Sequence, residues 1–189
     1  MTVILNPTYT KPILVVADII QTWMSLAPGQ VMLGYQKFDI PTNGLFIVLT
    51  NVADAAIGGD NFIQPDGLGG EQEVGQDYIV EDLQIDVMSF DDEARQRRRE
   101  VQMALRSIYS QQQQVQNFIQ IAPNIMPMMD TSALEITKYL NRFTTRIRVA
   151  SVDQVIRANA PYYASFTGQL NTDPKGTTPA TVNPAQTPA

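Results

Sequence analysis

The sequence contains no cysteine and no histidine. Without cysteine, the chain has no disulfide, no cysteine-ligated zinc and no thiol chemistry. Without histidine, it has no Ser-His-Asp triad, no histidine acid–base chemistry and no histidine ligand for a metal. An enzyme built from this chain would rely on Asp, Glu, Lys, Tyr, Ser or Thr alone, and no catalytic constellation of these residues is visible. We therefore expect no enzymatic activity, no cofactor and no metal.

Long apolar runs and an excess of positive charge are also lacking. The longest apolar runs, at residues 13–17 and 45–49, are too short to cross a bilayer, and we see no signal peptide. We expect a protein that is soluble and cytoplasmic when it is made, without a membrane partner. The net charge of −6 argues against a dedicated nucleic-acid binder, which usually presents a basic face.

What the sequence does contain is one well-patterned domain. The 189 residues are 44% hydrophobic, which suits a single domain with a substantial core. We expect this domain at residues 1–157, followed by a C-terminal extension at 158–189 that is rich in proline and threonine. The extension has too few apolar groups to offset the entropy of ordering, so we expect it to be extended and, if ordered, held by other chains.

Hydrophobic periodicity predicts two main helices. The first carries apolar residues at helical spacing over residues 13–27, after a candidate cap at Thr10, and ends at Pro28-Gly29. The second begins after a cap at Ser89 or Asp91 and ends near residues 109–114. The buried stripe expected for the second helix is Ala94, Val101, Ala104, Leu105 and Ile108.

Apolar runs and alternating patterns predict five strands. Asn43-Gly44 is a hairpin signal between two of them, which favours antiparallel pairing. The order of helices and strands predicts an α+β fold, in which a mainly antiparallel or mixed sheet is packed by helices on one face. The predicted strands are residues 31–38, 45–52, 78–89, 133–137 and 141–152.

Residues 53–77 carry six of the 11 glycines and six acidic residues. The segment has no lysine, so it is not a P-loop, and its acids lack the spacing of a calcium-binding EF-hand loop. We interpret it as an extended arm or a mobile hairpin used in assembly, with a plain disordered loop as the alternative. Its acidic residues are Asp54, Asp60, Asp66, Glu71, Glu73 and Asp77.

Charged residues mark two further candidate surfaces. Strand 78–89 places Asp82 and Asp86 on its polar face, and the last strand does the same with Arg146 and Arg148. If these strands are neighbours, the four residues form cross-strand pairs; otherwise they bind a partner or line a channel. A carboxylate pair for glycoside hydrolysis is a third reading, but nothing in the sequence indicates a sugar cleft.

The arginine run at 95–99 is either a solvated helix face paired with nearby acids, a subunit contact, or a contact to DNA. Met126, Met128 and Met129 either fill the core or form an adaptable surface. The full set of candidate interface residues is Asp60, Asp66, Glu71, Glu73, Asp82, Asp86, Arg95, Arg98, Arg146, Arg148, Tyr162 and Tyr163.

Several segments, in order, resemble one known family. They are Gly-Leu-Phe-Ile-Val-Leu-Thr at 44–50, Gly-Gly-Glu at 69–71, the strand and helix start at 83–94, Leu-Arg-Ser at 105–107, and the closing strand at 142–154. Between residues 33 and 155 the chain thus resembles the neck or tail-terminator proteins of tailed bacteriophages. It departs from their pattern at 123–130, which is rich in methionine rather than aromatic, and in the C-terminal extension.

The resemblance implies a structural virion protein that forms a ring, commonly six-fold. Such a ring terminates the tail tube and joins it to the head connector, leaving a channel for DNA. The implied partners are further copies of the chain, the tail-tube or sheath protein, the connector or adaptor protein, and genomic DNA that passes without sequence-specific binding. The implied location is the virion neck, after assembly in the host cytoplasm. Another structural role, as a head-completion adaptor, tail-tube or baseplate subunit, is the alternative.

Overall fold

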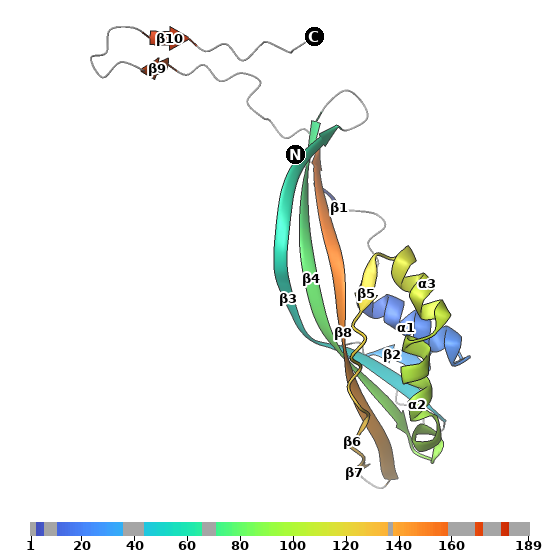
Figure 1. The fold of residues 1–189 in the computed structure, drawn as a ribbon. Coiled ribbons are helices and arrows are strands. Elements are labelled where there is room, and N and C mark those ends of the chain that lie inside the picture. Colours follow the sequence, from blue (N-terminus) through green and yellow to red (C-terminus); the bar gives the residue numbers. More distant parts are fainter. Residues whose placement is uncertain are drawn as a thin grey trace.

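The computed structural model describes residues 3–5, 11–35, 44–65, 71–135, 138–158, 169–171 and 179–181. Over these residues the chain is an α+β protein, as the sequence predicts, with helices packed on one side of a mixed sheet (Figure 1). The elements in chain order are β1 (Val3–Leu5), α1 (Pro12–Trp23), β2 (Val31–Leu33), β3 (Phe46–Pro65), β4 (Glu71–Ser89), α2 (Glu93–Leu105), α3 (Ile108–Gln116), β5 (Ile119–Ile121), β6 (Met129–Asp130), β7 (Ala133–Glu135), β8 (Lys138–Ala158), β9 (Gln169–Asn171) and β10 (Pro179–Thr181).

Three long antiparallel strands, β3, β4 and β8, form the body of the sheet, whose strand order is β1-β8-β4-β3-β2. The edge of β8 that faces away from β4 is paired in turn with β7, β6, β5 and β1. The edge of β3 that faces away from β4 is paired only with β2, in parallel, among the described residues. Within the C-terminal extension, β9 and β10 pair with each other.

Strand alternation puts the core on one face of the sheet. The helices cover this face with a stripe that includes Val16 and Ile20 of α1, while β4 and β8 supply residues two apart along each strand. A smaller cluster around Phe46 and Val48 lies on the opposite face. Strand alternation predicts an inward set on the two central strands, and all but one of its members are buried: Leu83, Ile85, Val87, Phe143, Thr145, Ile147 and Val149. The exception is Ile79, which is only partly buried.

The predicted hairpin at Asn43-Gly44 is wrong, because β2 runs parallel to β3. The amide of Ile47 donates to the carbonyl of Gln30 at 2.7 Å, and the Gln30 side chain donates to the carbonyl of Leu45 at 2.8 Å. These bonds hold the start of β2 beside the start of β3. Both strands are almost entirely apolar, so their patterns do not distinguish parallel from antiparallel pairing. Residues 36–38 of the predicted first strand lie outside the described part.

The helices also differ from expectation at their ends. The first stops at Trp23, before Pro28-Gly29, and its N-cap is Lys11; the predicted cap Thr10 lies outside the described residues. The predicted second helix is two helices, because Ser107 breaks it. Its hydroxyl accepts a hydrogen bond from the amide of Ser110 at 3.0 Å and thereby starts α3.

This break also makes one burial prediction wrong. Ala94, Val101, Ala104 and Leu105 are buried as expected, but Ile108 is 75% exposed. It begins α3 rather than continuing the stripe of α2. The N-cap of α2 is Asp92 rather than the predicted Ser89 or Asp91. The two predicted residues still bond to amides of the first turn: the hydroxyl of Ser89 accepts from the amide of Ala94, and the carboxylate of Asp91 accepts from the amide of Glu93, each at 2.9 Å.

The glycine-rich segment at 53–77 is not a long loop. The ladder between β3 and β4 continues from Phe46 opposite Met88 to Pro65 opposite Glu71. Two register shifts add one residue each to β3, between Asn51 and Ala53 and again between Ala56 and Gly58. Each shift moves the following side chains out of step with the partner strand, so the alternation that identifies a strand is lost from the sequence.

Candidate assembly surface

The long strands extend beyond the helices, as Figure 1 shows for β3, β4 and β8. We call residues 52–65 of β3 and 71–82 of β4 the outer hairpin. Every residue from 52 to 63 is exposed, whereas residues 46–49 of the same strand are buried. A sheet normally buries one face against a second layer. The β3 part of the outer hairpin therefore offers surface that the described residues do not bury, whereas Val74 on the β4 part is buried.

The outer hairpin has a free strand edge. The last described bond on this side of β3 in the ladder with β2 comes from the amide of Gly34 to the carbonyl of Leu49, and the hydroxyl of Tyr35 donates to the carbonyl of Asn51. Within the described part of the chain, no strand pairs with this edge from residue 52 to 65. That length corresponds to about 45 Å of extended chain. An unpaired edge of this kind is a template for pairing with another chain.

Large apolar side chains are exposed on the same hairpin. Ile57 is 69% exposed and Ile63 is 49% exposed, and Phe62 and Tyr78 are also exposed. Ile57 is the extra residue at the second register shift, which explains why it has no partner on β4. Exposed apolar groups that gather on one element indicate a contact surface more than isolated ones do.

On the outer hairpin, acidic residues also lie opposite one another on neighbouring strands. Asp54 lies directly opposite Glu81 between β3 and β4, and Asp77 lies directly opposite Asp153 between β4 and β8. Burial raises the pKa of the Glu81 carboxyl, the charge of Asp54 raises it further, and Lys11 opposes the rise. Like charges at facing positions destabilise a sheet. The isolated subunit therefore carries an electrostatic cost along this hairpin.

Three predicted acidic residues have different surroundings. Asp60 and Glu71 are exposed and form no ion pair among the described residues. The carboxylate of Glu73 lies 3.8 Å from the guanidinium of Arg157 on β8. Asp66 lies outside the described residues, as do Tyr162 and Tyr163.

The predicted cross-strand charge pairs are confirmed in part. β4 and β8 are neighbours, and Arg148 donates to the carboxylate of Asp82 at 2.9 Å. These hydrogen bonds from Arg148 lower the pKa of Asp82. Arg146 is exposed and faces Gln84, whose side-chain oxygen accepts from it at 3.4 Å.

Asp86 takes a partner that sequence reasoning missed. Its carboxylate accepts from Arg142 at 2.8 and 3.2 Å and from the hydroxyl of Thr144 at 2.5 Å. The side chain of Asp86 is 3% exposed, so this pair is structural and is not free to line a channel or bind another chain. The alternation of β8 that placed Arg146 and Arg148 on this face also includes Arg142, which was the available signal.

The arginines of α2 divide into paired and unpaired groups. Arg97 bridges Glu93 and Glu100 and donates to the carbonyl of Met24 at 3.0 Å. Arg95 pairs with Asp92 at 3.2 Å. The prediction that Arg98 pairs with a nearby acid is wrong, because its guanidinium lies 4.4 Å from the centre of the Phe143 ring and forms no ion pair among the described residues.

Two exposed arginines of this helix and its C-cap have no acidic partner among the described residues: Arg99, which belongs to the predicted arginine run, and Arg106, which lies outside it. Met103 is exposed and lies between them at helical spacing. The exposed face of α2 is thus basic with an apolar centre.

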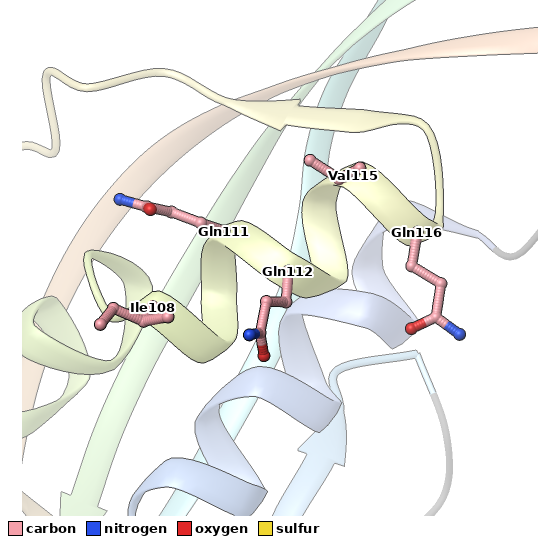
Figure 2. A pocket seen from close by; sticks show the side chains of 5 residues that line it. All are labelled: Ile108, Gln111, Gln112, Val115 and Gln116. Atoms are coloured by element: carbon pink, nitrogen blue, oxygen red, sulfur yellow. The ribbon is translucent and has the colours of Figure 1, made fainter.

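The exposed side of α3 carries a shallow hollow of about 380 Å³, lined by Ile108, Gln111, Gln112, Val115 and Gln116. Figure 2 shows Ile108 and Val115 on different turns of α3, with the glutamines beside them. Val115 is 78% exposed. Sequence reasoning missed this face, because it treated Ile108 as part of the buried stripe.

The methionine segment is divided between the core and the surface. Met128 packs against the core, whereas Met126 and Met129 are exposed. In the part of the chain that the structure describes, no group of three or more acidic residues is placed to hold a metal ion, and no helix is long and apolar enough to cross a membrane.

No family model matches the sequence, and no curated protein matches it.

Proposed function

We propose that the chain is a structural virion protein of a tailed-phage neck, in which copies form a six-fold ring. The ring terminates the tail tube, joins it to the head connector and leaves a channel for DNA. The observation that carries this proposal is the outer hairpin, which leaves the helix-covered core with a free strand edge and exposed apolar residues. An element of this kind contributes its full stability only when another chain covers it.

The asymmetry of the sheet favours a ring over a symmetric dimer. One side of the long-strand sheet is paired with short strands along β8, while the other side, β3, is free beyond Leu49 among the described residues. The two sides of a subunit therefore present different surfaces. Contacts between different surfaces of identical copies are head-to-tail, and they close into rings when the rotation between copies allows it.

The negative charge of the subunit suits the wall of a channel through which DNA moves. Each copy has a net charge of −6, so a ring of such copies repels the phosphate backbone. DNA would then slide through without adhering to the wall. The sequence resemblance to neck and tail-terminator proteins supports the same role, with the tail-tube or sheath protein on one side and the connector protein on the other.

A different virion subunit is the second candidate. A protruding hairpin also serves contacts between stacked rings, as a tail-tube, baseplate or head-completion subunit would need. The position of the protein on the particle separates these roles from the neck.

Native mass spectrometry of the purified chain tests the proposal. We expect a hexamer for the full chain, and a weaker or absent hexamer for a chain that ends at residue 157 if the C-terminal extension joins subunits. Immunogold labelling of intact particles should then place the protein at the head–tail junction. A monomer at all concentrations, together with no label at the neck, would overturn the proposal.

A further inference from the structure

The chemistry of the outer hairpin defines the kind of surface that could cover it. The hairpin segment from residue 53 to 81 contains seven acidic residues and no lysine or arginine. A neighbour that covers it must bring positive charge, because its facing acids already repel one another at Asp54 and Glu81. It must also bring apolar surface to cover Ile57 and Ile63.

One face of the described residues meets both requirements. Residues 94–106 of α2 and its C-cap hold five arginines against one glutamate. Arg99, Met103 and Arg106 are spaced by four and three residues, so they share one side of the helix, and all three are exposed. Only one residue separates Arg106 from Ile108, where the apolar hollow of α3 begins (Figure 2).

We call this surface, formed by Arg99, Met103, Arg106, Ile108 and Val115, the docking face. We propose that it binds the outer hairpin of a second copy of this chain. The acidic side chains of the hairpin lie against Arg99 and Arg106, and its apolar side chains cover Met103 and the hollow beside Ile108. This inference rests on the proposed function, since it identifies the contact that joins neighbouring copies in the ring.

The tip of the outer hairpin cannot reach α2 of its own chain. The ladder that joins β3 to β4 is continuous to Pro65, and β4 is paired with β8 along the same length. Arg98 of α2 lies over Phe143, in the same row of the sheet as Val87 and Ile47. From Ile47 to Pro65 the strand covers about 60 Å. The hairpin tip and α2 are therefore at different ends of the sheet, and only another copy brings them together.

The contact is head-to-tail, because one copy provides the hairpin and the next provides the docking face. Each copy then has one acidic and one basic partner surface, so the same contact repeats around a closed ring. Opposite charges across the contact would speed association and fix which surfaces meet. Added salt should weaken it, because the participating charges are exposed.

Charge reversal on each side provides the test. In one variant, Arg99→Glu and Arg106→Glu make the docking face acidic; in the other, Asp60→Lys and Glu71→Lys reverse two of the seven acidic charges of the hairpin. We expect each variant alone to associate at least about tenfold more weakly than the wild type, since like charges then face each other at these positions. An equimolar mixture should recover a hexamer with alternating copies, because the two glutamates of the first variant then meet the two lysines of the second.

The matched control is Arg99→Lys with Arg106→Lys, which keeps the charge and should leave the hexamer intact. Circular dichroism of every variant establishes that it is folded. Hexamers that form equally well from each reversed variant would overturn the docking face while leaving the ring in place. A wild-type chain that stays monomeric at all concentrations would overturn both the ring and this contact.

Discussion

The carboxylate of Asp86, on β4, is held by the guanidinium of Arg142 on β8 through bonds of 2.8 and 3.2 Å. Asp86 is almost completely buried, while Arg142 is partly exposed. An ion pair of this kind adds little over an apolar pair, but removal of one partner leaves a buried charge. We therefore expect the loss of Arg142 alone to lower the free energy of unfolding.

Replacing Arg142 with Met should destabilise the chain by about 3 kcal/mol, because the charge of Asp86 loses its main partner. Adding Asp86→Asn to this variant should recover part of the loss, since no buried charge then remains. Urea unfolding of both variants measures the difference. Equal stability of Arg142→Met and the wild type would contradict the structural role of the pair.

Glu81 should make the chain less stable at neutral pH than at pH 4.5. Burial and the facing Asp54 raise its pKa above the ordinary value of 4.5. Above that pH the unfolded chain releases this proton before the folded chain does, so the free energy of unfolding falls until the folded carboxyl is also ionised. The Glu81→Gln variant should melt at a higher temperature than the wild type at pH 7, and the difference should shrink toward pH 4.5. Thermal melts across this range measure the effect, and Glu71→Gln, an exposed glutamate on the same strand, is the control.

The apolar side chains of α3 should matter for association and not for folding. Ile108 and Val115 are both more than 70% exposed, so changing both to Ser should alter the free energy of unfolding by no more than about 0.5 kcal/mol each. The hexamer of this variant should nevertheless dissociate at a higher protein concentration than the wild-type hexamer does. Leu105→Ala is the contrasting variant, because Leu105 is buried and its truncation should cost about 2–5 kcal/mol. Unfolding curves and light scattering of the same samples separate the two effects.

The outer hairpin should be removable without loss of the core. Ala56 and Ile79 face each other across β3 and β4, so the dipeptide Asn-Gly in place of residues 57–78 closes a shorter hairpin. The helices keep their packing partners on the buried half of the sheet, and we expect a folded monomer. Analytical ultracentrifugation and circular dichroism report both properties. A shortened chain that still forms hexamers would show that another surface joins the copies.

The sequence predicted the central strands well, because their pattern repeats every two residues and one face is fully buried. Leu83, Ile85 and Val87 of β4 illustrate this, and the same logic puts Arg148 on the polar face of β8, where it pairs with Asp82. Alternation puts Arg142 on that face as well, but which arginine meets which acid depends on the register between β4 and β8. A shift of one residue would put every side chain on the other face.

Other features depend on contacts that no local pattern contains. The parallel pairing of β2 is supported by two hydrogen bonds: the amide of Ile47 on β3 donates to the carbonyl of Gln30, and the Gln30 side chain donates to the carbonyl of Leu45, just before β3. The segment of the outer hairpin is predicted as an extended arm or a mobile hairpin, but its continuous strands are not, because its glycines and its two register shifts hide the strand pattern. Ile108 was assigned to the core, because helical spacing continued through Ser107, where the helix ends. In each case the missing information lies in the tertiary structure.

The free edge of β3 also bears on the chain before it meets its neighbours. An exposed edge with Ile57 and Phe62 is the kind of segment through which chains stack into fibrils. Two such edges from different copies would bring Asp54 and Asp60 of one chain toward the same acids of the other, and their repulsion disfavours that pairing. We therefore expect these acidic residues to act as gatekeepers against stacking of the edge.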